Sequence, residues 1–176
     1  MKPRANLLNF EEARERLLAA AAPLSSIETL PLLQAQGRVL AQAVTSPLNV
    51  PGFDNSAMDG YALHVAGLNA LPDAFAVVQR IAAGQTGTAL AANTAARIFT
   101  GAPIPEGANV VVPQENTQDE NGAIKLTQPI QLHQHIRRKG EDITQGGPVL
   151  AAGQRLGAQH LAMLASIGVA SVSVFA

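Results

Sequence analysis

The stretch PGFDNSAMDGYAL, residues 51–63, combines two turns with the start of a β-strand. A Pro-Gly pair opens it, and Asp59-Gly60 is a second turn signal directly before the apolar run that begins at Tyr61. Short β-rich runs follow, separated by clusters of Gly, Pro, Asn and Asp about every 8 to 15 residues. This rhythm is typical of an antiparallel β domain, so we expect a barrel or sandwich-like module.

The β-rich runs lie on both sides of this stretch. Each combines β-branched or aromatic residues with a turn signal at its end. The runs that we expect to form strands are RVLAQAV (38–44), YALHV (61–65), AFAVVQRI (74–81), RIFT (97–100), NVVVP (109–113) and AIKLTQ (123–128).

Helical patterns flank the β-rich part. Asn9 and Glu12 form a capping-box pattern before a helical run that Pro23 ends. A second helical run covers residues 157–167, and the strand-like run VASVSVF follows it at residues 169–175. The first helix either packs on its own domain or docks on a second subunit.

Each flank is too small to bury a core alone, so we expect the two flanks to pair with each other. The sequence therefore predicts a mainly β fold with a few helices, of the α+β class. Residues 1–45 and 142–176 form a discontinuous N-terminal domain, a small α/β-type unit with a leading helix. Residues 46–141 form an inserted antiparallel β domain.

Composition excludes several kinds of site. The chain of 176 residues has no cysteine, which excludes disulfides, Cys-ligated zinc, iron–sulfur clusters and a cysteine nucleophile. Its four histidines have no metal-binding spacing such as HExxH. With 12 Lys and Arg against 13 Asp and Glu, no Trp and one Tyr, we expect no nucleic-acid partner. No run approaches the roughly 20 apolar residues of a membrane span, so we expect a cytoplasmic protein without a membrane partner.

Three polar stretches could carry chemistry. In the first, Asn55, Ser56 and Asp59 lie among apolar side chains that would anchor the loop, and anchored polar loops are typical of sites. The same residues could equally hold the loop in shape. In the second, Thr100-Gly101 offers a hydroxyl and a flexible backbone N–H, as anion-binding turns do. The alternative is a rigid connection after Thr100.

The third stretch is IRRKGEDITQGG, residues 136–147, in which consecutive cations precede two acids. A solvated charge cluster is the usual explanation of such a run. Alternatively, Arg137 and Arg138 clamp a phosphate or oxyanion while Asp142 holds a cation or orients an arginine. The candidate substrate-binding residues of the three stretches are Asn55, Ser56, Gly101, Glu115, Arg137 and Arg138.

Together, these stretches resemble the signature blocks of one family. The blocks are PGFDNSAMDGYAL (51–63), RIFTGAPIPEGANVVVPQE (97–115), IRRKGEDI (136–143) and PVLAAGQRLGAQHLAMLASIGVASVSV (148–174). In order and spacing they resemble the N-terminal half of the molybdopterin molybdenumtransferases, the bacterial MoeA proteins and the gephyrin E domain. The resemblance covers nearly the whole chain and rests on long, unusual blocks.

The resemblance implies a transferase of molybdenum cofactor biosynthesis. Such an enzyme takes adenylylated molybdopterin and molybdate, requires Mg²⁺ and releases AMP. Asp59, Thr100 and Asp142 match functional positions of the family and are the implied catalytic residues, and Asp59 is the candidate metal ligand. Arg137 and Arg138 are the implied contacts to phosphate or molybdate.

The resemblance also carries expectations about the rest of the protein. In the family, a pterin-binding α/β domain and a small C-terminal β domain follow, and we expect both to be absent from this chain. Full-length members are homodimers whose active site lies between subunits, so we expect the chain alone to be inactive. The molybdopterin adenylyltransferase is a candidate partner. The alternative function is a non-enzymatic binding or assembly module that uses the same fold.

Overall fold

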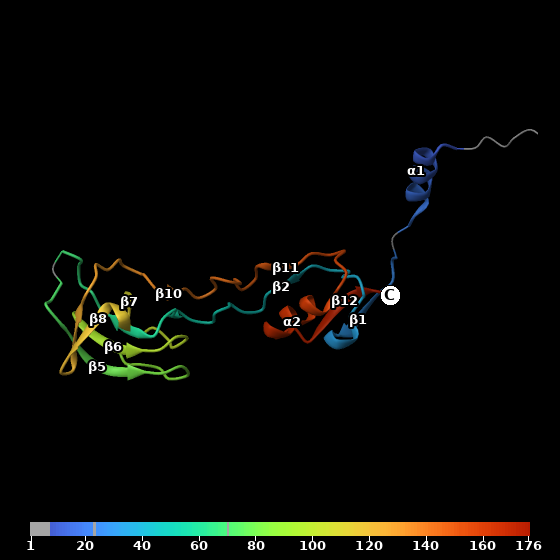
Figure 1. The fold of residues 1–176 in the computed structure, drawn as a ribbon. Helices are drawn as coiled ribbons and strands as arrows, with labels where there is room; N and C mark the ends of the chain where they lie inside the picture. The colour runs from blue at the N-terminus through green and yellow to red at the C-terminus, as the bar shows by residue number, and fades with distance from the viewer. Residues whose placement is uncertain (1–7, 23, 70) are drawn as a thin grey trace, which may run out of the picture. The chain divides into compact units, whose positions relative to one another are not determined.

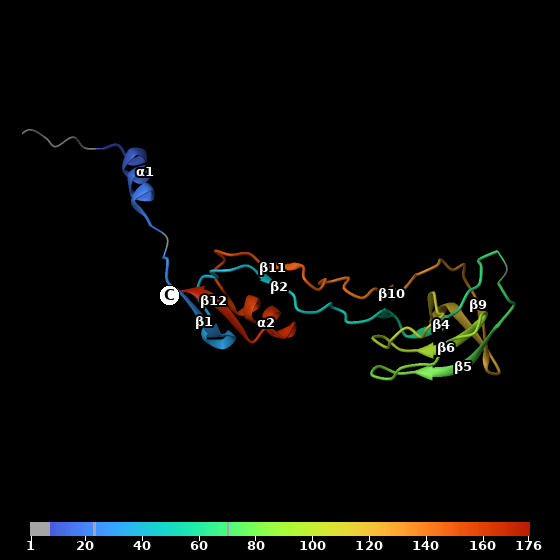
Figure 2. The same ribbon diagram turned by 180° about the vertical axis from the view of Figure 1, so that it is seen from behind.

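The computed structural model describes residues 8–22, 24–69 and 71–176, which form two compact units. Unit 1 contains the described residues up to Val44 together with Leu150–Ala176, and unit 2 is Thr45–Val149 (Figures 1 and 2). The chain passes from one unit to the other at β2 (Val44–Thr45) and returns at β11 (Pro148–Leu150). Unit 1 is therefore formed from two separate segments of the chain, and unit 2 is inserted between them.

Unit 1 joins a strand of the N-terminal flank to a strand of the C-terminal flank in one small sheet. Strand β1 (Ile27–Pro31) pairs antiparallel with β12 (Ser171–Phe175). Helix α2 (Ala158–Ser166) packs against the short 3₁₀ helix η1 (Leu32–Gln34). The side chains buried in this unit include Leu40, Leu156, Leu164, Ile167, Val172 and Val174. The helix and strand expected near the C-terminal end are thus confirmed, and the two flanks pair as expected.

Helix α1 (Phe10–Ala20) begins with the capping box that the sequence predicts. The Glu12 backbone N–H donates to Oδ1 of Asn9 at 2.9 Å, and the Asn9 N–H donates to the Glu12 carboxylate at 3.4 Å. No residue of the helix is buried, and Phe10 and Leu17 are 77% and 74% exposed. Within the part of the chain that the structure describes, nothing covers the apolar side chains of α1.

Unit 2 is built on a six-stranded sheet in the order β7-β4-β6-β5-β9-β8. Its core forms two clusters, and consecutive residues of β4, Ala62 and Leu63, belong to different clusters. Because side chains alternate along a strand, the sheet is covered on both faces. Its strands are β4 (Gly60–Leu63), β5 (Phe75–Ile81), β6 (Thr94–Ile98), β7 (Val110–Pro113), β8 (Thr117–Glu120) and β9 (Ala123–Leu126).

In the inserted β domain, the expected antiparallel arrangement is wrong at one pair of strands. Strands β5 and β6 run parallel, whereas the other pairs in this sheet are antiparallel. The connection between them, residues 82–93, is of the dozen-residue length that a parallel crossover needs. Alternation of apolar residues marks a strand but not its direction, so the sequence pattern does not distinguish the two arrangements.

Other differences concern the extent of strands. The run RVLAQAV (38–44) contributes only Val44 to a strand, although Val39 and Leu40 make isolated bridges. The sequence analysis does not predict strands β1 and β8. For β8 the reason is that its sequence, TQDE, has no apolar alternation. The Asn121-Gly122 turn, with positive φ at both residues, joins β8 to β9 and is the hairpin signal that would have predicted β8.

Residues 142–149 belong to unit 2, although the sequence analysis assigns them to the flanking domain. Their backbone explains the placement. The Asp142 N–H donates to the carbonyl of Val50 at 2.9 Å, and the Gly146 N–H donates to the carbonyl of Ser46 at 2.8 Å. The charge run that ends at Asp142 is therefore continuous with the β unit.

Gly60 provides a test of the register between β4 and β7. A Cβ added to Gly60 would lie 2.0 Å from the carbonyl oxygen of Val112 and 2.9 Å from Cα of Pro113, both of them backbone atoms. We expect Gly60→Ala to lower the free energy of unfolding by about 1–3 kcal/mol, measured by denaturant titration. Gly52→Ala is the matched control, because a Cβ there meets no atom within 4 Å. Equal stability of the two variants would contradict the register.

Candidate active site on unit 2

The loop within residues 51–63, which we call the central loop, runs between the other two polar stretches. On one side, the Gly101 N–H donates to the carbonyl of Ser56 at 2.9 Å, and the Ser56 N–H donates to the carbonyl of Ala102 at 3.0 Å. On the other side, β3 (Asn55–Ser56) pairs antiparallel with β10 (Ile136–Arg137). Backbone pairing thus brings together the three stretches that the sequence singles out.

Asp59 and Thr100 are in direct contact. The backbone N–H and the hydroxyl of Thr100 both donate to Oδ1 of Asp59, each at 2.8 Å. These two bonds, the backbone one first, lower the pKa of Asp59, and the positive charge of Arg97 lowers it further. Oδ2 of Asp59 has no hydrogen bond to any described residue. The pair therefore presents an ionised carboxylate with one oxygen open to solvent.

Arg97 is a residue of this site that the sequence analysis missed. Its guanidinium donates from Nη1 to the carbonyl of Gly60 at 3.0 Å and from Nη2 to Oε1 of Gln114 at 2.6 Å. The Gln114 N–H in turn donates to the carbonyl of Asp59 at 3.1 Å. The sequence signal that could have identified Arg97 is an arginine within an apolar strand, three residues before Thr100.

Glu115 lies next to this arrangement. It is an exposed residue of the 3₁₀ helix η2 (Gln114–Asn116), directly after the residue that binds Arg97. No hydrogen bond or ion pair of its side chain to another described residue is present. Its carboxylate therefore remains open to solvent.

Arg137, Arg138 and Asp142 form a second group. Arg137 pairs with Asp142, with Nη2 and Oδ2 2.6 Å apart, and this bond raises the pKa of Arg137. Arg138 pairs with Asp54 at 2.6 Å, and the backbone N–H of Lys139 donates to the other oxygen of Asp54 at 2.8 Å. Each arginine of this stretch thus already has a carboxylate partner.

The two groups remain separate in their contacts. No hydrogen bond or ion pair among the described residues joins Asp142 to Asp59 or Thr100. They are connected through the backbone of the central loop, which Asp54 and Asp59 both belong to. The structure therefore unites Asp59, Thr100 and Gly101 and places Asp142 with the arginines.

Asn55 and Ser56 are buried inside the central loop, with 6% and 0% of their surface exposed. The Ser56 hydroxyl donates to the carbonyl of Met58 at 2.6 Å and accepts a hydrogen bond from the Met58 N–H at 3.3 Å. The Asn55 side-chain amide donates to the carbonyl of Phe53 at 3.2 Å. Their side chains therefore shape the loop that presents Asp59.

A metal at this site would have a single protein carboxylate. The described residues contain no group of three or more His, Cys, Asp or Glu that could hold a metal ion. Mg²⁺ is commonly held by one or two carboxylates together with water and substrate phosphates. An ionised Asp59 with a free Oδ2 fits that kind of coordination.

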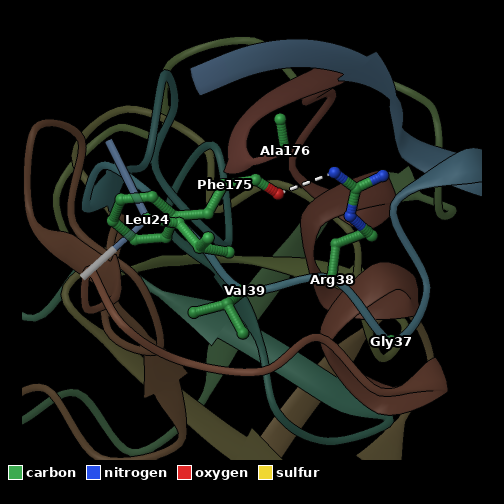
Figure 3. A pocket seen from close by; sticks show the side chains of 6 residues that line it. All are labelled: Leu24, Gly37, Arg38, Val39, Phe175 and Ala176. Atoms are coloured by element: carbon green, nitrogen blue, oxygen red, sulfur yellow. Dashed lines mark hydrogen bonds between the residues drawn. The ribbon is translucent and has the colours of Figure 1, made fainter. Parts of the chain in front are cut away.

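A cavity of about 400 Å³ lies in unit 1, away from all these residues in the sequence. It is lined by Leu24, Gly37, Arg38, Val39, Phe175 and Ala176 (Figure 3). Among the described residues that line it, Arg38 has the one charged side chain, which is already bound to the carbonyl of Phe175 at 2.6 Å and to the carboxylate of Glu28. This cavity offers no group for catalysis, so we place the functional site on unit 2.

Among the described residues, no helix is long and apolar enough to cross a membrane. The fold and site define a two-unit, mainly β module in which a Thr-Gly turn binds an ionised carboxylate. The family model described as "MoeA N-terminal region (domain I and II)" matches residues 8–168. The chain belongs to this family, and the resemblance seen in the sequence is confirmed.

Similar proteins agree with this assignment. The chain is 42% identical over 176 residues to the molybdopterin molybdenumtransferase of Synechococcus elongatus, covering 96% of this chain and 44% of the relative. It is 37% identical to that of Haemophilus influenzae, covering 96% and 42%. A crystal structure of the molybdopterin biosynthesis MoeA protein from Pyrococcus horikoshii superposes with a TM-score of 0.86 at 32% identity, covering 96% and 46%. The chain spans less than half the length of these relatives.

The bond between Asp59 and Thr100 predicts a measurable titration shift. Because the folded-state pKa of Asp59 is lowered, its stabilising effect is present above the ordinary value of 3.8 and is lost as the pH falls through the lowered pKa. We expect Thr100→Val to raise the pKa of Asp59 part of the way back, since the stronger backbone bond remains. Carboxyl NMR titration measures this value.

Thr88→Val is the matched control for this titration. The Thr88 hydroxyl donates to Oε1 of Gln79 at 3.2 Å and makes no contact with Asp59. We expect the control to leave the pKa of Asp59 unchanged. An unchanged pKa in Thr100→Val as well would show that the hydroxyl does not bind Asp59 in solution.

Proposed function

We propose that this chain is the N-terminal portion of a molybdopterin molybdenumtransferase. The full-length enzyme would insert molybdate into adenylylated molybdopterin and release AMP, in the biosynthesis of the molybdenum cofactor. Family membership and the names of the relatives support this proposal. These names favour an enzyme over a non-enzymatic binding module. The observation that carries the proposal is the ionised Asp59 carboxylate held by Thr100.

Asp59 is the proposed catalytic carboxylate and metal ligand. Its Oδ1 accepts two hydrogen bonds from Thr100, which leaves Oδ2 to bind Mg²⁺ or to orient a water molecule. When bound, Mg²⁺ would neutralise phosphate charge on the substrate. Thr100 is the proposed positioning partner, and the neighbouring Gly101, with φ of +79°, leaves the turn open to an anionic ligand.

The second group is the proposed contact to an anionic part of a substrate. Arg137 and Arg138 are exposed enough to reach a ligand, with 40% and 48% of their side chains accessible. Both would exchange or share their carboxylate partners on binding, because each is already paired. Asp142 would then hold Arg137 in place before the ligand arrives. Glu115, Asn55 and Ser56 complete the proposed site, the last two by holding the loop.

We further propose that turnover requires the rest of the full-length protein. The relatives are more than twice as long as this chain, and unit 2 offers open surface residues rather than an enclosed pocket around Asp59. We propose a cytoplasmic homodimer for the full-length protein, with the molybdopterin adenylyltransferase as a candidate partner. Both proposals come from the family resemblance.

The decisive test is Asp59→Asn in the full-length protein. The amide can still accept from Thr100 but carries no charge, so we expect a loss of about a hundredfold or more in AMP release from adenylylated molybdopterin with molybdate and Mg²⁺. Asp119→Asn is the matched control, since Asp119 is an exposed carboxylate on β8. Equal activity of both variants would reject the catalytic role of Asp59.

A second test addresses the chain alone. We expect residues 1–176 to release no measurable AMP under conditions in which the full-length protein turns over. The physical reason is that binding both substrates requires surfaces beyond this chain. Turnover by the chain alone at the full-length rate would refute the requirement for the remaining domains.

A further inference from the structure

A row of aromatic and cationic side chains crosses one face of the unit-2 sheet. Tyr61 on β4 lies opposite Arg97 on β6, and Arg97 lies beside Arg80 on β5. Phe99, two residues after Arg97, extends the row toward Thr100. Cζ of Arg80 is 4.5 Å from the centre of the Phe99 ring, and Cζ of Arg97 is 4.8 Å from the same centre. Two guanidinium groups thus contact one ring.

A β-bulge brings Arg80 onto this face. The register between β5 and β6 shifts between Val77 and Gln79, so that Val77 pairs with Ala95 whereas Arg80 pairs with Arg97. Val77 packs on one core cluster, and Ile81 lies in the other, on the opposite face of the sheet. Without the bulge, strict alternation would place Ile81 on the face of Val77 and Arg80 on the opposite face. Bulges of this kind re-aim side chains, often beside functional sites.

The positive charges of Arg80 and Arg97 are not neutralised by ion pairs. Among the described residues, no carboxylate lies within 4.0 Å of the guanidinium of Arg80 or Arg97. Arg137 and Arg138, in the same unit, both have such a partner. Like charges side by side on a sheet are destabilising, and the cation–π contacts with Phe99 act against this repulsion.

Arg80 and Arg97 differ in how many of their side-chain N–H donors already make hydrogen bonds. Arg97 donates to Gly60 and Gln114, and the charge of Asp59 acts on it. The guanidinium of Arg80 makes no hydrogen bond to a described residue, and Arg80 is exposed. Arg80 therefore offers a full set of N–H donors to solvent, held in place by the ring of Phe99.

We propose that Arg80 and Arg97 form a binding site for a dianionic tetrahedral group, either a free oxyanion or the phosphate of an ester. The planar N–H fork of arginine matches the oxygens of such a group, and two adjacent cations favour a double negative charge. Phe99 fixes the orientation of both guanidinium groups before the ligand binds. This site is separate from the Arg137–Asp142 group, and it shares Arg97 with the candidate active site at Asp59 and Thr100.

Tyr61 provides a probe at the site itself. It is the one tyrosine of the chain, which has no tryptophan, and Cζ of Arg97 lies 5.1 Å from the centre of its ring. Tyrosine fluorescence of the 176-residue chain therefore reports on this surface. The titrants are inorganic phosphate, molybdate and AMP, each against sodium chloride at the same ionic strength.

We expect saturable binding that Arg80→Gln weakens by about tenfold in Kd. Lys125→Gln is the matched control: it removes the same charge from the same sheet, but Lys125 is paired with Glu120 at 2.8 Å. We expect this control to change Kd by less than about twofold. Tighter binding of AMP than of inorganic phosphate would assign the site to a phosphate ester, and the reverse order to a free oxyanion.

Two results would overturn the proposal. One is the absence of a saturable response to all three anions beyond that of sodium chloride. The other is an equal loss of binding in Arg80→Gln and Lys125→Gln. If circular dichroism shows that Arg80→Gln is unfolded, Arg80→Lys replaces it, and full affinity in that variant would exclude a role for the guanidinium fork. Failure here leaves the enzymatic proposal intact, since Asp59→Asn tests that separately by AMP release.

Discussion

Unit 2 depends on the close approach of two backbones at Gly60. Strand β4 lies between β6 and β7, and the missing side chain of Gly60 lets its backbone meet Val112 and Pro113. The same residue pairs with Ile98 on β6, so the next residue outward, Asp59, meets the turn that follows β6 at Thr100. The position of the carboxylate thus depends on strand register as well as on the hydrogen bonds within the loop.

The two pairs of arginines in unit 2 differ in how their charge is balanced. Arg137 and Arg138 each contact a carboxylate, and such exposed ion pairs contribute little stability while they hold a loop in one shape. Arg80 and Arg97 instead share the ring of Phe99 and keep N–H donors open. The paired arginines therefore suit a structural or exchangeable contact, whereas the unpaired ones suit an incoming anion.

Much of the local structure follows from sequence patterns. The capping box of α1, helix α2 and strand β12 were predictable, because caps, periodicity and glycine punctuation act over a few residues. The parallel pairing of β5 with β6 was not, since direction depends on how a long connection folds back. The β-bulge that turns Arg80 to the other face of the sheet also could not be predicted from the sequence, because a register shift depends on the partner strand.

The mainly β character, the three polar stretches and the family follow from the amino-acid sequence alone, because turn residues and long motifs are read along the chain. It also identified Asp59 and Thr100 as separate candidates. The three-dimensional structure shows that these two residues bind each other, that Arg80 lies beside Arg97, and that Asp142 belongs to another group. The physical reason is that these contacts are made across strands, and strand register is fixed by backbone hydrogen bonds between segments far apart in the chain.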